Sequence, residues 1–210
     1  MLRYVTTNEG KIREAREYLG EETIEQRDFD YTEIQAPELE PIAAAGAREA
    51  YQRMAGPVIV DDAGLFIDDF EGFPGPYSSF VENTIGVERV WELAQQIDSA
   101  QASFRCVLAY CDGKPVEASP DPIDRTERAA TVAHGDFEEA DQDTLLPVKL
   151  FAGAVPGTIV APRGDGGFGY DPIFEHDGET LAEMSTEQKN SLSHRGRALS
   201  EFAEWYSQRD

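Results

Sequence analysis

The segment VIVDDAGLFIDD, at residues 58–69, limits the possible folds more than any other part of the chain. Its first three residues are β-branched, which is typical of a strand buried inside a sheet. That run ends in two adjacent carboxylates, Asp61 and Asp62, which repel each other unless a cation, a basic side chain or a proton neutralises them. The fold must therefore bring a neutralising group to the end of a buried strand, and that group should indicate the function.

Strand-like and helix-like segments alternate along the chain, which predicts an α/β fold. The expected strands are residues 2–5, 23–29, 58 onward, 103–110, 145–152 and 157–161, and the expected helices are residues 9–19, 42–54, 87–97, 185–190 and 191–208. Because the middle strands follow one another without helices between them, we expect a mixed sheet. Residues 1–210 are expected to form a single domain that can be divided into two lobes.

Acidic residues dominate the charge, since 41 Asp and Glu face 18 Lys and Arg and leave a net charge of −23. Such self-repulsion excludes general affinity for nucleic acid or anionic membranes. Molar salt would screen it, so the composition indicates an extreme halophile. Residues 112–146 hold ten acids against three bases and are predicted to be a solvated excursion. Because neither a membrane span nor a signal peptide is evident, we expect a cytoplasmic protein.

Two cysteines, Cys106 and Cys111, lie five positions apart on one predicted strand. Residues at an odd spacing on a strand point to opposite faces of the sheet. The two thiols can therefore form neither a disulfide nor a metal site with each other, and they are expected to be reduced and structural.

The segment TTNEGK places Thr6, Thr7 and Asn8 at a strand-to-helix turn and Lys11 in the first helical turn. Backbone N–H groups at the start of a helix, together with an ammonium group, make a reasonable phosphate site. It is not a P-loop, because the glycine spacing is absent. The simpler interpretation is an N-cap followed by a surface lysine.

The carboxylates Asp61 and Asp62 are hard oxygen ligands that suit Mg²⁺, which commonly takes one or two carboxylates together with waters and phosphates. Glu33, in an acidic loop, could complete such a site. Otherwise one aspartate caps the following turn and the other is solvated.

Two segments near the C-terminus complete the set of candidate site residues. The segment RGDGGFGYDPIF fails as a dinucleotide fingerprint, because Tyr170 and Asp171 stand with a proline where a helix should begin. It can instead be a flexible glycine loop that presents Phe168 and Tyr170 to a flat base, or a hairpin turn with core aromatics. The segment KNSLSHRGRAL gathers Lys189, His194 and Arg195 into a basic cluster, unless these residues are solvated charges beside a helix cap formed by one of its serines.

Taken together and in this order, six segments resemble the inosine/xanthosine triphosphate pyrophosphatase family. The matching segments are TTNEGK, YTEIQ, PVIVDDAGL, GFPGPYS, GGFGYDPIF and KNSLSHRGRAL. The resemblance implies an elongated, curved mixed sheet flanked by helices and a nucleotide cleft between two lobes. It also implies a homodimer and Mg²⁺-dependent hydrolysis of ITP, dITP and XTP to the nucleoside monophosphate and pyrophosphate.

The resemblance also implies roles for individual residues. Glu33, Asp61 and Asp62 would bind the metal. Asp62 would act as the general base on water, and Lys11 would be the second catalytic residue. The residues that would contact the phosphates are Thr6, Thr7, Asn8 and Lys11, those around the base are Phe168, Gly169, Tyr170 and Asp171, and those elsewhere at the nucleotide are Lys189, His194 and Arg195. In this scheme Mg²⁺ and the triphosphate neutralise the paired acids.

The chain departs from the family pattern at three positions. Ala63, beside the substrate, stands where the family usually has a hydroxyl residue, and Gly46 and Ser79 lie near positions that carry a basic residue in many relatives. These changes leave open a nucleotide-binding module without turnover. A pyrophosphatase for modified pyrimidine or methylated nucleotides is the other alternative, although the base-pocket segments favour a 6-oxo purine.

Overall fold

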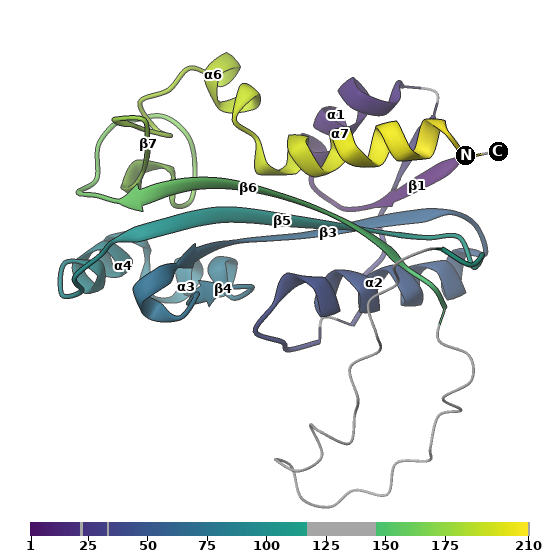
Figure 1. The fold of residues 1–210 in the computed structure, drawn as a ribbon, viewed down its shortest axis with the longest axis horizontal. Coiled ribbons are helices and arrows are strands. Elements are labelled where there is room, and N and C mark those ends of the chain that lie inside the picture. Colours follow the sequence, from purple (N-terminus) through teal and green to yellow (C-terminus); the bar gives the residue numbers. More distant parts are fainter. Residues whose placement is uncertain (22, 33, 117–145, 210) are drawn as a thin grey trace, which may run out of the picture.

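The computed structural model describes residues 1–21, 23–32, 34–116 and 146–209. In this part of the chain an eight-stranded mixed sheet has the order β2-β1-β3-β5-β6-β7-β8, with β4 paired to β3 outside that path (Figure 1). The strands are β1 (Leu2–Val5), β2 (Ile24–Arg27), β3 (Val58–Ile67), β4 (Pro74–Gly75), β5 (Gln101–Cys111), β6 (Lys149–Ile159), β7 (Phe174–His176) and β8 (Glu179–Thr180). The helices are α1 (Glu9–Leu19), α2 (Leu39–Met54), α3 (Ser78–Ile85), α4 (Val87–Ala94), α6 (Thr186–Ser191) and α7 (His194–Ser207), with short 3-10 helices at Asp68–Phe70 and Asp171–Ile173. The prediction of a mixed sheet flanked by helices is confirmed.

Strand β3 is the axis of the sheet and differs from its sequence-based prediction. It pairs antiparallel with β5 from Val58 opposite Cys111 to Ile67 opposite Ala102. The paired acids Asp61 and Asp62 therefore lie in the middle of the strand and not at its end. The reason is that the β5 ladder holds the backbone extended through a sequence with low strand propensity.

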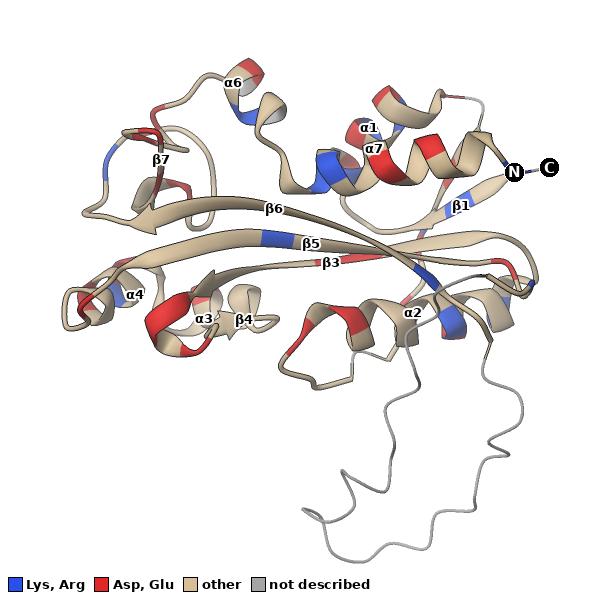
Figure 2. Cartoon of the chain, viewed as in Figure 1, with Lys and Arg blue, Asp and Glu red and all other residues tan. Residues whose placement is uncertain are grey.

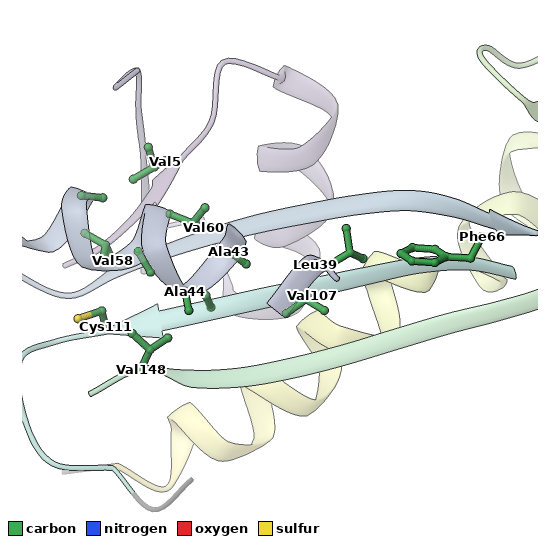
Figure 3. Close-up of a cluster of buried hydrophobic side chains, with 13 residues drawn as sticks. Val5, Leu39, Ala43, Ala44, Val58, Val60, Phe66, Val107, Cys111 and Val148 are labelled. Atoms are coloured by element: carbon green, nitrogen blue, oxygen red, sulfur yellow. The ribbon is translucent and has the colours of Figure 1, made fainter. Parts of the chain in front are cut away.

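Helices cover the sheet on both faces, as Figure 1 shows. Helix α2 packs on one face through a cluster that includes Leu39, Val60 and Val107 (Figure 3). Helices α1 and α7 cover the opposite face, where Tyr4 and Phe202 belong to a second cluster. A third cluster joins α3, α4 and the Asp171–Ile173 turn to the far end of the sheet.

The two cysteines follow the predicted alternation along β5. Cys111 belongs to the cluster beneath α2, whereas Cys106 contacts Asp61 on the opposite face. Both thiols are buried and free, so the prediction of reduced structural cysteines is confirmed.

Other elements differ from the predictions in their bounds. Helix α2 begins at Leu39, which places Pro41 in its first turn, where proline is tolerated. Helix α3 was not predicted, and the two strands expected at residues 145–161 form the single strand β6. Most of the acidic excursion lies outside the described residues, so its character stays a prediction, as does the single two-lobed domain.

Charged residues are distributed over many elements, and acidic residues occur on α1, α2, α3 and α7 (Figure 2). In the described part of the chain, no helix combines the length and apolar character that crossing a membrane requires.

Candidate active site

The two adjacent carboxylates lie on an open stretch of the β3 edge. Strand β1 pairs with β3 up to Ile59, and β4 pairs with it from Leu65 onward. Between these contacts, residues 60–64 have no strand partner on this side among the residues that the structure describes, while β5 pairs with them on the other side. An open edge presents backbone N–H and C=O groups to its surroundings. A ligand here would meet that backbone together with Asp61 and Asp62.

Asp61 is the buried member of the pair, and two cations neutralise it. The ammonium group of Lys11 in α1 lies 2.9 Å from its Oδ1 atom, and Nε of Arg195 in α7 lies 2.9 Å from its Oδ2 atom. The hydroxyl of Tyr4 donates a 2.7 Å hydrogen bond to Oδ1, and the thiol of Cys106 lies 3.8 Å from Oδ2. Burial alone would raise the pKa of Asp61, but Lys11 and Arg195 hold it well below its usual range.

Asp62 points to the opposite face of the sheet, because successive side chains of a strand alternate. It shares that face with Val60 and Phe66, which belong to the cluster beneath α2. Its carboxylate is partly buried, and Oδ1 accepts a 2.9 Å hydrogen bond from the N–H of Ala63.

The expectation that a metal and a triphosphate neutralise both acids is therefore wrong for Asp61. Two basic side chains of the chain itself neutralise that residue. Glu33, the other expected ligand, lies outside the described residues. Within the described part of the chain, no three His, Cys, Asp or Glu side chains are grouped closely enough to hold a metal by themselves.

The TTNEGK segment forms the turn from β1 into α1, as predicted. Asn8 is the N-cap, and its side-chain oxygen accepts hydrogen bonds from the N–H groups of Gly10 at 2.8 Å and Lys11 at 3.3 Å. Thr6 supports the turn by accepting a 3.1 Å hydrogen bond from the N–H of Asn8, and Thr7 is exposed. The cap thus engages two of the N–H groups expected at a phosphate, while Lys11 turns toward Asp61.

The aromatic residues of the glycine loop have different environments. Phe168 is 82% exposed, whereas Tyr170 is buried and its hydroxyl donates a 2.9 Å hydrogen bond to the carbonyl of Ser78 in α3. The expectation that the loop presents both rings is therefore wrong for Tyr170, which anchors the loop. The buried carboxylate of Asp171 accepts hydrogen bonds from the ammonium of Lys189 and, at 2.8 Å, from the N–H of Phe168.

A lysine and a glycine fix the shape of this loop. The ammonium of Lys189 lies 5.0 Å from the centre of the Phe168 ring. Gly167 has φ of 76°, and a Cβ atom there would come within 2.3 Å of Asp171 Oδ2. A side chain at residue 167 would clash with the Asp171 carboxylate, so the loop needs glycine there to fold over Asp171.

The predicted basic cluster at the C-terminal helices divides between two places. Lys189 forms an ion pair with Asp171 and lies over the Phe168 ring, whereas Arg195 forms an ion pair with Asp61. His194 is partly buried and stacks on Phe104 with ring centres 5.5 Å apart. Burial, followed by the nearby Arg195, lowers the pKa of His194 to about 3, so this histidine adds no charge near neutral pH.

This environment predicts how His194 affects stability at low pH. Below pH about 6.5 the unfolded chain protonates this imidazole, while the folded chain does not until the pH approaches about 3. Stability is therefore lost as the pH falls through this window. We expect His194→Phe, which keeps a ring against Phe104, to reduce the loss of unfolding free energy between pH 7.5 and pH 5 by up to about 2 kcal/mol. Urea unfolding of both proteins measures this, and an equal acid sensitivity would contradict it.

Sequence reasoning missed three residues that organise the site. Tyr4 donates a hydrogen bond to Asp61. Glu14 Oε2 lies 3.4 Å from Arg195 Nη1, and the Glu14 carboxylate also accepts a hydrogen bond from Ser193. The carbonyl of Ser78 accepts the hydrogen bond from Tyr170 that fixes the glycine loop. One signal was present, because Glu14 follows Lys11 by three positions and therefore shares its face of α1.

The structure explains one departure from the family pattern. A Cβ atom at Gly46 would lie 2.7 Å from Cε2 of Tyr31, so any side chain there would require this ring to shift. Ser79 is exposed in the first turn of α3, and its surroundings give no reason for the absence of a basic residue.

Comparison with known proteins identifies the family. The model of the Ham1 family matches residues 2–121 and 119–205. This chain belongs to the Ham1 family. Among solved Ham1 structures, the HAM1 protein from Coxiella burnetii has a TM-score of 0.75 and 25% sequence identity, with 99% of this chain and 98% of that chain covered.

Curated relatives of this Ham1 chain carry an enzymatic name. A dITP/XTP pyrophosphatase from Thermococcus kodakarensis is 42% identical, over 97% of this chain and 96% of the relative. A dITP/XTP pyrophosphatase from Methanosarcina mazei is 41% identical, over 97% of this chain and 95% of the relative. The resemblance inferred from the six sequence segments is confirmed.

Proposed function

We propose that this chain hydrolyses non-canonical purine nucleoside triphosphates, namely ITP, dITP and XTP, to the nucleoside monophosphate and pyrophosphate. The observation that carries the proposal is the open edge of β3, where Lys11 and Arg195 gather on one face and the carboxylate of Asp62 lies on the other. The ammonium of Lys11 suits a polyphosphate, the guanidinium of Arg195 suits a hydrogen-bond acceptor on the base, and the carboxylate of Asp62 suits a water molecule that must lose a proton.

Asp62 is the general base in this scheme. It accepts a proton from the water that attacks the triphosphate, and the bond between the α- and β-phosphates breaks. Lys11 and the turn of Thr6, Thr7 and Asn8 hold the phosphates. Ala63 leaves its backbone N–H beside Asp62, but lacks a hydroxyl to add a phosphate contact.

Mg²⁺ fits the donors that are present. This ion commonly uses one or two carboxylates and completes its shell with waters and substrate phosphates, so it does not require a cluster of three protein ligands. Asp62 offers a partly buried carboxylate at the open edge, and Glu33 is the second proposed ligand. When bound, the ion would neutralise the charge that develops on the phosphate oxygens.

The base is held by the glycine loop and by Arg195. Phe168 provides an exposed ring for stacking, and Gly169 and Asp171 shape the loop beneath it, with Lys189 alongside. Arg195 carries five N–H donors, of which the Asp61 and Glu14 contacts use two, so it retains donors for a 6-oxo group. His194 supports this corner as a neutral ring against Phe104.

A panel of nucleotides tests the proposal. Purified protein in high KCl with Mg²⁺ is expected to release pyrophosphate from ITP, dITP and XTP, and much less from ATP. Binding of ITP without release of pyrophosphate would identify a binding module without turnover. A preference for modified pyrimidine or methylated nucleotides would assign a different substrate class.

Adaptation to molar salt is part of the same proposal, because the net charge is −23. Repulsion among surface carboxylates is strongest in dilute buffer, where screening is weak. We expect the melting temperature to rise by about 10 °C or more between 0.1 M and 2 M KCl. An uncharged osmolyte at matched osmolality is the control. A melting temperature that does not respond to KCl would remove the halophile interpretation.

We further propose a cytoplasmic enzyme that assembles as a homodimer. The homodimer follows from the family resemblance, and the cytoplasmic location is the expectation from the sequence. Sedimentation analysis in the same high-salt buffer tests the oligomeric state, and a single species with the mass of one chain would exclude the dimer.

A further inference from the structure

Asp61 is the meeting point of four elements of the fold. Lys11 comes from α1, Arg195 from α7, Tyr4 from β1 and Cys106 from β5, and all four approach the same carboxylate. The side chain of Asp61 is 1% exposed, so these neighbours replace its water. A buried carboxylate stays ionised in such a place because it is paired and hydrogen-bonded.

Lys11 and Arg195 keep exposed surface and further hydrogen-bond donors that do not contact Asp61, so both can also bind a ligand. The side chains of Lys11 and Arg195 remain 23% and 18% exposed. The Asp61 contact uses one of three ammonium donors of Lys11 and the Nε donor of Arg195. Because a lysine or arginine side chain has many rotamers, fixing one of its donors restricts where the others point.

The hydrogen bonds and ion pairs of Asp61 make a metal ion at its carboxylate unfavourable. Oδ1 accepts hydrogen bonds from Lys11 and Tyr4, and Oδ2 accepts one from Arg195. A divalent cation at either oxygen would be placed within a few ångströms of two positive charges, which repel it strongly in a buried site.

We infer that Asp61 is a positioning residue and not a metal ligand: its carboxylate orients Lys11 and Arg195 toward the nucleotide at the open edge of β3, and this role rests on the proposed function. The paired acids then have separate tasks. Asp61 arranges cations on one face of the sheet, and Asp62 serves the chemistry on the other.

The test compares Asp61→Asn with Asp112→Asn. Asp112 is a matched control, because it also forms an ion pair with an arginine, Arg209 at 2.7 Å, and accepts a hydrogen bond from a tyrosine, Tyr110 at 3.0 Å. We expect Asp61→Asn to raise KM for ITP at least tenfold, to change kcat less than threefold, and to leave the Mg²⁺ concentration for half-maximal rate within twofold of the native value. Asp112→Asn should leave all three quantities within twofold.

Two results would overturn the inference. A tenfold or greater rise in the Mg²⁺ concentration for half-maximal rate, with a matching loss of Mg²⁺ binding in calorimetry without nucleotide, would make Asp61 a metal ligand. An unchanged KM would show that Lys11 and Arg195 need no such support. If Asp61→Asn does not fold, Tyr4→Phe decides, since it removes one hydrogen bond from Asp61 and keeps every charge. A two- to fivefold rise in KM at unchanged Mg²⁺ dependence supports the inference, and an unchanged KM refutes it.

Failure of the proposed function gives a different result. If the native protein releases pyrophosphate from no nucleotide, the dissociation constant of ITP replaces KM as the readout. A tenfold weaker affinity in Asp61→Asn, with Asp112→Asn unchanged, would still establish the positioning role. Equal affinities in the two variants would reject it.

Discussion

Asp62→Asn is expected to lower the rate of pyrophosphate release from ITP by about 10²- to 10⁴-fold while the fold stays intact. The amide cannot take a proton from water and is a poorer ligand for Mg²⁺. Its side-chain oxygen can still accept the hydrogen bond from Ala63 N–H, which the native carboxylate accepts at 2.9 Å. The substitution therefore removes the chemistry and keeps the local geometry.

Steady-state kinetics at saturating ITP and Mg²⁺ measure the effect, and the melting temperature verifies that the variant is folded. Asp68→Asn is the matched control, because Asp68 directly follows β3 and is exposed. That change removes the same charge at the end of the same strand and should leave the rate within twofold. A rate for Asp62→Asn above about a tenth of the native value would exclude Asp62 as the general base.

Local sequence signals were sufficient for part of the helix and strand pattern. The N-cap at Asn8, the amphipathic pattern of α4 and the β-branched run that begins β3 act over a few residues, and the structure contains each of these elements. The alternation of side chains along a strand was equally reliable, since Cys106 and Cys111 lie on opposite faces of β5.

Long-range pairing explains where the predictions were wrong. Two strands were expected, at residues 145–152 and 157–161, yet β6 runs on without a break because β5 pairs with it from Gln101 to Tyr110. Pro156 fits there because β7 pairs with β6 further along, at Thr158 and Ile159, so the missing N–H costs no ladder bond on that side. The same effect extends β3 through Asp61 and Asp62.

The partners of the charged residues were beyond sequence reasoning for a related reason. Asp61 and Arg195 are 134 positions apart, and Asp61 and Lys11 are 50 apart. Local patterns can show that an acid needs a counter-ion, but several lysines and arginines could supply it. The packing of α1 and α7 on the same face of the sheet decides which of them do.

Arg195→Ala is expected to narrow the preference for ITP and XTP over ATP by tenfold or more. A guanidinium can only donate, so it favours the 6-oxo group of hypoxanthine and xanthine over the 6-amino group of adenine. A mismatched base would leave a desolvated donor unpaired, which is why such a contact discriminates strongly. Values of kcat/KM for ITP, XTP, GTP and ATP measure the change. GTP also carries a 6-oxo group, so its kcat/KM should fall by a factor similar to that of ITP. Discrimination against GTP must come from contacts at the purine 2-position.

Arg195 also neutralises Asp61, so the selectivity effect must be separated from damage to this ion pair. Removing one partner of a buried pair can cost about 3 kcal/mol or more, although Lys11 remains beside Asp61. Arg195→Lys is the matched variant, since it keeps a charge for Asp61 but lacks the planar fork of donors. If Arg195 reads the base, the lysine variant recovers stability and still discriminates poorly. Equal losses on all four nucleotides in both variants would instead show that Arg195 serves the phosphates or the fold, and the base-reading role would pass to the loop around Phe168.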